Sequence, residues 1–279
     1  MSTTTRPLHT LSPEAETAAT DIFAHDRRRA RTLALQTAGA VVVVAGACWA
    51  TGLFDIDRLA TGVPDFFDLV GEMLPPNFAN GGSWIRPVLD TLAMSVAGTA
   101  LAVLGSLPLA FLAARNTSPH PAVYQVARVV LNFLRAVPEL IMGIIFVAAV
   151  GFGALPGVLA LGFHSIGMIG KFFAEAVEHV DQRPVEAARA AGAGPLQCIV
   201  HAVLPQVLGK MADVAIYRWE YNFRASTILG AVGAGGIGFE LIGSLRIMQY
   251  TEVSAIILVI LLMVTLVDGF GSWLRTQIK

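Results

Sequence analysis

The chain has 279 residues, of which 55% are hydrophobic and only 14% are charged, and its mean hydropathy is +0.66. Because a soluble domain carries about a quarter charged residues, this composition excludes an ordinary soluble protein and favours one that crosses a membrane several times. The net charge of -1 gives no overall attraction to nucleic acid.

Apolar runs predict six membrane-spanning helices, and therefore an all-α polytopic membrane protein. In chain order the runs cover residues 32–54, 91–114, 125–150, 155–179, 206–230 and 253–273. Each run is long enough to cross about 30 Å of hydrocarbon at about 1.5 Å per residue. Glycines are frequent inside the runs, as close helix contacts in a membrane favour.

The run 206–230 contains charged residues that a hydropathy window alone would reject. They are Lys210, Asp213, Arg218, Glu220 and Arg224. We keep it as a crossing because the Lys and Arg distribution requires one. Thirteen Lys and Arg residues lie on one side of the predicted membrane, in the N-terminal tail, the regions 115–135 and 181–210 and the C-terminus. Three lie in the segments on the other side of the membrane. Since cytoplasmic loops are enriched in Lys and Arg, both termini are expected in the cytoplasm.

The same distribution makes residues 1–31 a cytoplasmic tail and residues 55–86 an external segment. This external segment is acidic and is interrupted by prolines and glycines, so it is too short and broken for a core of its own. Its aromatic residues Phe66, Phe67 and Trp84 are expected at the membrane interface, where aromatic side chains form a belt. The alternative is that the segment contacts an external protein.

The loop 181–205 reads as two short helices joined by a glycine bend. Pro184 suits the first turn of a helix, Gly192 and Gly194 interrupt it, and Pro195 starts a second helix. From shape alone, an amphipathic connector without a special role is an equal alternative.

A spaced motif in this loop points to one family. Glu-Ala-Ala is followed after three residues by Gly, and then after eleven residues by Leu-Pro. The residues are Glu186, Ala187, Ala188, Gly192, Leu204 and Pro205. The pattern resembles the signature loop of ABC importer permeases, except that Ala202 replaces an isoleucine. The resemblance implies that the loop couples the chain to a groove on a separate ATPase subunit.

The resemblance covers about residues 85–279, the five-helix importer-permease core, to which the 32–54 helix is an addition. It implies a transmembrane permease domain over residues 87–279. The stretches 135–139, 170–175, 218–226 and 228–238 look like the phosphonate permease branch, although methionine and betaine importers share a similar glycine-rich stretch.

As a member of that branch, the chain would be a homodimeric permease of the bacterial inner membrane. It would translocate phosphonate or a related phosphorus oxyanion, with an ATPase dimer and an external substrate-binding protein as partners. Whether the cargo is phosphonate, phosphite or phosphate stays open. The chain itself would not be an enzyme.

Polar residues and glycines inside the spans are candidates for the translocation path. They are Lys171, Arg218, Glu220, Arg224, Ser226, Gly233, Gly235 and Gly236. An unpaired charge in a span costs at least about 2.5 to 3.5 kcal/mol, so these charges must be paired or face water. One alternative pairs Arg218 or Arg224 with Glu220 or Asp213. The other makes the arginines a cationic lining for an oxyanion, which the guanidinium fork suits.

The glycines 233, 235 and 238 fit a G-x-G-x-x-G pattern, but no βαβ unit surrounds them, so we expect a kinked backbone that acts as a gate. Gly170-Lys171 lacks the remaining elements of a Walker A loop. No metal site and no cofactor are expected, because no His, Cys and carboxylate cluster has ligand spacing. An ion-coupled secondary transporter would show inverted repeats, and an intramembrane enzyme would need a nucleophile and base; neither pattern is found.

Overall fold

The computed structural model describes the backbone of residues 13–278 and the side chains of residues 29–278. The expected tail 1–31 therefore lies almost wholly outside the described side chains. The chain divides into two units, residues 1–68 and residues 69–279. The described residues contain helices and no strand, which confirms the all-α fold class.

The first unit holds α1 (Pro13–Ala50) and the start of α2 (Ile56–Glu72). Within α1 the stretch Arg29–Ala50 is long and apolar enough to cross a membrane. The helix ends four residues before the expected limit, because Gly52 takes a positive φ of 75° in the turn that follows. Asp55 then caps α2, its Oδ1 accepting a hydrogen bond from the Arg58 backbone N–H at 3.1 Å.

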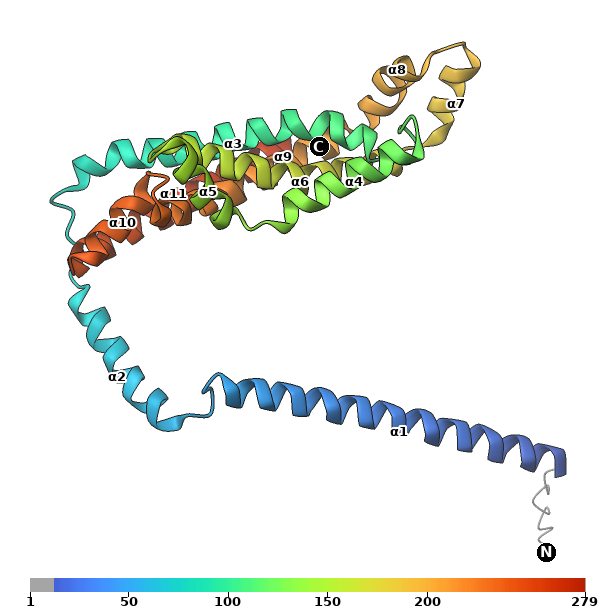
Figure 1. The fold of residues 1–279 in the computed structure, drawn as a ribbon, viewed down its shortest axis with the longest axis horizontal. Helices are drawn as coiled ribbons and strands as arrows, with labels where there is room; N and C mark the ends of the chain where they lie inside the picture. Colours follow the sequence, from blue (N-terminus) through green and yellow to red (C-terminus); the bar gives the residue numbers. More distant parts are fainter. Residues whose placement is uncertain (1–12, 279) are drawn as a thin grey trace, which may run out of the picture. The chain divides into compact units, whose positions relative to one another are not determined.

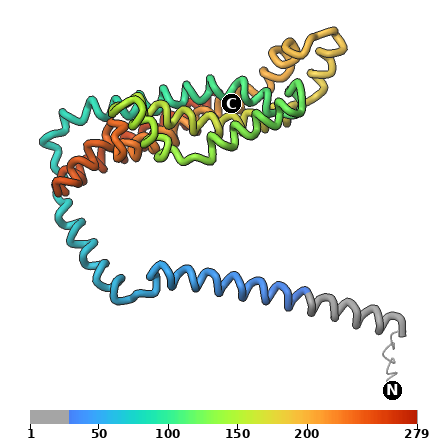
Figure 2. The backbone as a smooth tube through the Cα atoms, in the orientation of Figure 1, coloured from blue at the N-terminus to red at the C-terminus, as the bar shows by residue number. Residues whose placement is uncertain are grey.

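The second unit is a helical bundle. Its elements are α3 (Ile85–Leu112), α4 (Pro121–Ala136), α5 (Glu139–Val150), α6 (Ala154–Glu178), α7 (Gln182–Ala190), α8 (Pro195–Cys198), α9 (Leu204–Leu229), α10 (Ile237–Arg246) and α11 (Tyr250–Ile278). The long helices α3, α6 and α9 run side by side along the bundle (Figure 1). The helices α7 and α8 project from one end of it, as the backbone trace also shows (Figure 2).

The bundle core depends on small residues where α3 meets α6. A Cβ added at Gly98 would lie 2.9 Å from the Leu161 Cβ, and one at Gly162 would lie 2.5 Å from the Leu101 side chain. Glycines at these positions let the two helices approach closely. Close packing of this kind drives helix association in a membrane, where the hydrophobic effect does not bring helices together. Larger buried side chains, among them Phe173 and Met94, fill the remaining space.

The expected single helix at 125–150 is wrong, since α4 and α5 meet there at an angle of 86°. The break falls at Val137 and Pro138. A proline cannot donate a backbone hydrogen bond and drives the preceding residue into an extended conformation, and Val137 has φ −83° and ψ 118°. Within the described residues, five other helices are long and apolar enough to span, and the bent pair brings the number to the predicted six if it crosses as one span.

The expectation that Trp84 lies in an interfacial aromatic belt is also wrong. Trp84 is only 2% exposed and packs with Ile237, Ala255 and Ile256. It precedes α3 in a 3₁₀ turn, Gly81–Trp84, and so closes one end of the core. Phe66 and Phe67 remain 60% and 66% exposed.

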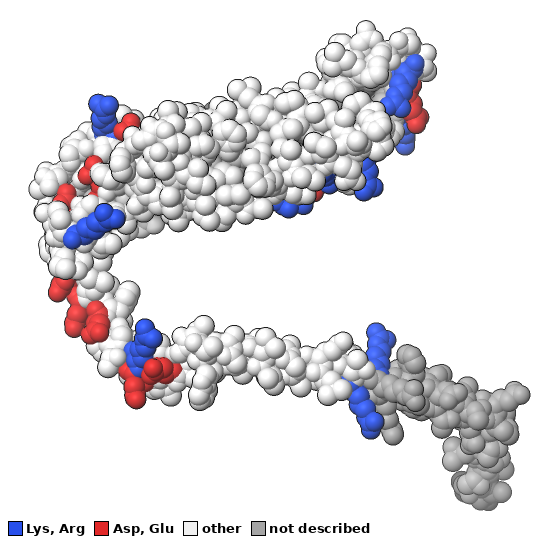
Figure 3. Space-filling view, viewed as in Figure 1, with Lys and Arg blue, Asp and Glu red and all other residues white. Residues whose placement is uncertain are grey.

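Charged side chains of the second unit gather near its two ends on the face shown in Figure 3, and the surface between the ends is mostly uncharged. One of these ends carries α7 and α8 (Figure 1). This distribution is the one a membrane-spanning bundle needs, because charge is costly in hydrocarbon.

The packing of α3 on α6 predicts that Gly98→Val destabilises the bundle, because the added methyl groups meet Leu161 and the Val158 carbonyl. Overpacking of this kind typically costs about 1 to 3 kcal/mol. Thermal unfolding of the detergent-purified protein should show a lower midpoint for this variant. Gly269→Val is the matched control, because no atom lies within 4 Å of a Cβ built there. An equal effect of the two substitutions would contradict the packing argument.

Candidate functional site

The loop 181–205 forms a compact unit at the end of the bundle. The helix α7 begins at Gln182, two residues before Pro184, because the Asp181 side chain accepts a hydrogen bond from the Arg183 backbone N–H at 3.0 Å. Val185 is buried and anchors α7 to the core. Glu186 and Ala187 are exposed, so the start of the motif is free to contact another protein.

Gly192 ends α7 in a Schellman motif. Its N–H donates to the Arg189 carbonyl at 2.9 Å, and the Ala193 N–H donates to the Ala188 carbonyl at 3.0 Å. The φ of Gly192 is +88°, whereas no atom lies within 4 Å of a Cβ built on it. The bend therefore favours glycine at residue 192 because of the positive φ, and not because a larger side chain would collide with its surroundings. The expected helix, glycine bend and second helix are confirmed.

The end of the loop continues into α9 through one turn of π-helix, Ile199–Val203. Ala202, the departure from the motif, is buried beside Val203. Gln206 then ties both ends of the loop together. Its Oε1 accepts from the Asp181 N–H at 2.9 Å, and its Nε2 donates to the Asp181 carbonyl at 3.2 Å. No sequence signal singled out this glutamine.

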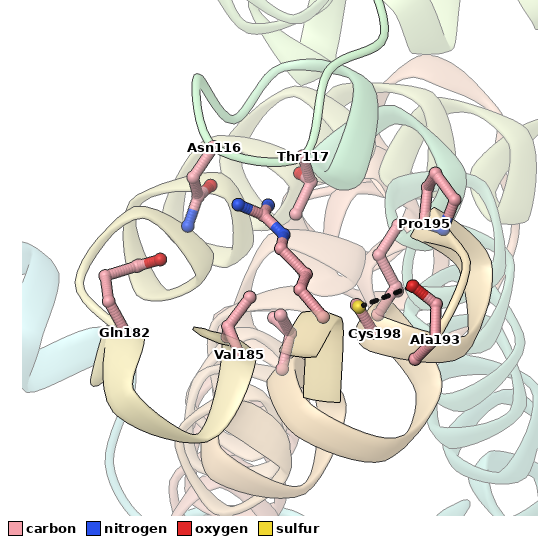
Figure 4. A pocket seen from close by; sticks show the side chains of 10 residues that line it. Asn116, Thr117, Gln182, Val185, Ala193, Pro195 and Cys198 are labelled. Carbon is pink, nitrogen blue, oxygen red and sulfur yellow. Dashed lines mark hydrogen bonds between the residues drawn. The ribbon is translucent and has the colours of Figure 1, made fainter. Parts of the chain in front are cut away.

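A pocket of about 320 Å³ lies between the loop and the turn that joins α3 to α4. Asn116 and Thr117 of that turn lie opposite Val185 of α7 and Cys198 at the end of α8 (Figure 4). The Cys198 thiol donates to the Ala193 carbonyl at 3.7 Å. The pocket is thus walled on one side by the loop itself.

Inside the bundle, a chain of buried polar groups joins three helices. The Arg218 Nε of α9 donates to the Ser165 Oγ of α6 at 2.8 Å, and that hydroxyl donates to the Asn222 Oδ1 at 3.0 Å. The Asn222 Nδ2 donates in turn to the Thr99 Oγ1 of α3 at 2.9 Å. Arg218 also stacks on the Tyr221 ring, 4.1 Å from its centroid. Its Nη2 is buried and has no partner among the described residues.

A second polar cluster holds the break between α4 and α5. The Tyr221 hydroxyl donates to Glu139 Oε1 at 2.7 Å, and His164 Nε2 lies 3.2 Å from Glu139 Oε2. His164 Nδ1 is 2.9 Å from the Val137 carbonyl. A carbonyl only accepts hydrogen bonds, so Nδ1 carries a proton. The imidazole is thus held between the Val137 carbonyl and the Glu139 carboxylate.

Two ion pairs connect α9 to α11. Arg224 Nη1 lies 2.7 Å from Asp268 Oδ1 and 2.9 Å from Oδ2. Arg275 Nη2 lies 2.8 Å from Glu220 Oε1. The expected pairs of Arg218 or Arg224 with Glu220 or Asp213 are therefore wrong. Arg224 pairs with Asp268 instead, and Arg218 bonds to the Ser165 hydroxyl and has no carboxylate partner among the described residues. Asp213 instead lies 3.5 Å from Lys210.

The two ion pairs differ in exposure. The Glu220 side chain is only 6% exposed, and a Cβ at Gly271 would collide with its carboxylate, so a glycine there makes room for the buried acid. The Arg224 and Asp268 side chains are 43% and 44% exposed. Arg218 and Ser226 are buried with Glu220. With Gly233 and Gly236, which are also buried, five of the eight path candidates thus lie inside the chain.

Arg224 belongs to an exposed polar stripe along α9. Lys210, Asp213, Tyr217 and Arg224 follow at intervals of three, four and seven residues, which places them on one helix face over about 21 Å. Lys171 lies on α6, partly exposed and 3.7 Å from Glu175. By contrast, the exposed residues of α11 are mostly apolar, including Leu261, Leu262 and Leu266.

The backbone between α9 and α10 is unwound, as expected. Gly233, Gly235 and Gly236 have φ of 94°, 77° and 73°. A Cβ at Gly236 would lie 2.5 Å from the Thr91 Oγ1 of α3, and that hydroxyl accepts a hydrogen bond from the Ile237 N–H at 2.9 Å. The segment is therefore held tightly against α3 although it is not helical.

Known proteins resemble this chain over most of its length. The phosphite transport system permease protein PtxC of Stutzerimonas stutzeri is 69% identical over 245 residues, which cover 86% of this chain and 89% of that protein. The phosphate-import permease protein PhnE of Mycolicibacterium smegmatis is 47% identical over 213 residues, 75% of this chain and 40% of that protein.

A solved chain of the MetNI methionine ABC transporter, described as inward facing, has the same fold. Its TM-score is 0.60 at 23% identity, covering 70% of this chain and 96% of that chain. Residues 106–279 match the family described as binding-protein-dependent transport system inner membrane component. The chain therefore belongs to this family and is a multi-pass permease subunit of an ABC importer.

Proposed function

We propose that the chain is the permease of an importer for phosphite, phosphonate or a related phosphorus oxyanion. One structural observation carries the proposal: a half-exposed arginine, Arg224, lies on the polar stripe of a membrane-spanning helix. A guanidinium presents donors in a fork that matches the oxygens of such anions. The names of the two relatives, a phosphite permease for PtxC and a phosphate-import permease for PhnE, support the same substrate class.

In this proposal the chain works as a homodimer with an ATPase dimer and an external substrate-binding protein. Because the polar stripe of α9 is exposed in the single chain, a second copy facing it would enclose an aqueous path. Arg224, Lys171 and the glycines 233, 235 and 236 would line or gate this path. The buried Arg218, Glu220 and Ser226 would hold the lining helices in place. The domain proposed for this role covers residues 87–279.

The proposed mechanism needs no catalysis by this chain. ATP binding on the partner closes the two ATPase subunits, and the loops 181–205 follow because they are docked on them. The helices then expose the path to the outer side, where a loaded binding protein releases its cargo. Direction comes from the different affinities of the two states for ATP and for the loaded binding protein.

The substrate class can be tested with the complete importer in proteoliposomes. ATP-dependent accumulation of phosphite or methylphosphonate is expected, and accumulation of methionine or betaine is not. Methionine accumulation in place of phosphorus oxyanions would refute the proposal. Uptake that proceeds without ATP and follows an ion gradient would favour a secondary transporter.

The exposed Glu186 predicts that charge reversal weakens capture of the ATPase. Glu186→Lys should reduce co-purification of the ATPase and ATP-driven uptake by about tenfold or more, while the permease still inserts into the membrane. A charge reversal at Asp57 of α2 is the control, since it lies outside the loop. The role proposed for Glu186 fails if both variants retain normal ATPase capture.

The positive φ of Gly192 predicts which substitutions the loop tolerates. Gly192→Val should weaken ATPase capture, because a β-branched residue is strongly strained at this backbone conformation. Gly192→Asn should retain most of the capture, because asparagine adopts left-handed conformations more readily. Pull-down of the ATPase from detergent extracts measures both. Equal loss in the two variants would indicate that the bend is not what matters.

The proposed orientation, with both termini cytoplasmic, predicts the location of fused reporters. A reporter fused after residue 75 should be located outside the membrane, and one fused after residue 195 should be located in the cytoplasm. Alkaline phosphatase and green fluorescent protein fusions distinguish the two sides. If both positions report the same side, the six-crossing topology is wrong.

A further inference from the structure

The ion pair between Arg224 and Asp268 is exposed although both residues belong to membrane-spanning helices. Their side chains are 43% and 44% exposed, and their atoms approach to 2.7 Å. Asp268 precedes Arg275 by seven residues on α11, which places it about 10 Å deeper along the helix. Charged groups at such depth are costly against hydrocarbon, so the exposed side of this pair faces protein or water.

The surroundings of the pair favour water. On α9, Lys210 and Tyr217 lie on the same exposed face as Arg224, at fourteen and seven residues before it. The centres of protein interfaces are depleted in charged residues, so a stripe of this composition does not suit a closely packed contact with a second copy. A water-filled path suits it, because such a path solvates both charges.

The guanidinium of Arg224 retains free donors. It has five N–H groups, and among the described residues only Nη1 is engaged by the carboxylate. The neighbouring Glu220 and Arg275 pair is closed by contrast, with the Glu220 carboxylate only 6% exposed and held in the space left by Gly271. Of the two pairs, that of Arg224 is the more exposed, with its arginine at 43% against 26% for Arg275.

We propose that Asp268 is a tethered carboxylate that competes with the transported phosphorus oxyanion for Arg224. This inference rests on the proposed function. In the empty path Asp268 neutralises the arginine. An arriving oxyanion displaces the Asp268 carboxylate and binds the Arg224 guanidinium. The ion pair of Arg224 with Asp268 forms again as the anion leaves. Passage requires a site that binds well enough to admit its ligand and weakly enough to release it. The carboxylate supplies the second condition.

Thiol chemistry in the assembled importer can test this inference. The complex with its ATPase and binding protein is placed in nanodiscs after Cys48→Ala and Cys198→Ala remove the native thiols. Tyr217→Cys then places a single thiol on the polar stripe of α9, about two helical turns from Arg224. Its rates with anionic and cationic methanethiosulfonate reagents are compared. Leu262→Cys is the matched control, since Leu262 and Tyr217 are 59% and 56% exposed but Leu262 lies on the apolar face of α11.

The Tyr217→Cys thiol should react with both reagents, and the Leu262→Cys thiol with neither. Adding Asp268→Asn should raise the anionic rate and lower the cationic rate by about tenfold each, and so raise their ratio by about a hundredfold. This is the effect of one unpaired charge about 10 Å away at an effective dielectric constant of about 20. Sodium phosphite should slow the reaction of the Tyr217→Cys thiol with the anionic reagent. The phosphite concentration needed for this protection should be at least about fivefold lower when Asp268→Asn is added. Arg224→Gln should abolish this protection.

The double variant Arg224→Gln, Asp268→Asn keeps the test valid if the single variant does not assemble, because it leaves no charge unpaired. It should show an unchanged rate ratio and no protection by phosphite. The inference is overturned if the Tyr217→Cys thiol is unreactive, if Asp268→Asn leaves the protecting concentration unchanged, or if the double variant is still protected. ATP-driven phosphite uptake, measured separately, decides the proposed function whatever the thiols report.

Discussion

The arrangement of this bundle depends on one constraint: hydrocarbon offers no partner to a charge or a hydrogen-bonding group. Each polar group within a span must therefore be satisfied by another helix or by water. Arg218 finds Ser165 on α6, while Glu220 and Arg224 find partners on α11. These contacts determine which helices can be neighbours of α9, and the small residues between α3 and α6 determine how close the helices lie.

The same constraint governs the backbone where it leaves the helical conformation. Two such places in the described bundle are the break before Pro138 and the glycine segment after α9. At the first, the Val137 carbonyl is met by His164. At the second, the Ile237 N–H is met by Thr91. Irregular backbone at membrane depth is tolerated only when buried in protein in this way or when it lines a water-filled cavity.

Much of this could be predicted from the sequence, because hydropathy, glycine position and motif spacing are local properties. The six spans, the helix pair around Gly192 and the unwound glycine segment followed from them. The partners of the charges within the spans could not be predicted, because Arg224 and Asp268 are 44 residues apart and meet only when α11 packs on α9. The proline break at 138 was missed for a different reason: the apolar run continues through it, and hydropathy does not register a change in direction.

The amide of Gln206 has a mechanical consequence. It holds Asp181, the residue that caps α7 shortly after the end of α6, to the first turn of α9 through both its donor and its acceptor. The two ends of the loop are therefore tied to each other where they meet the bundle. A force applied at the tip of α7 would therefore reach α6 and α9 together.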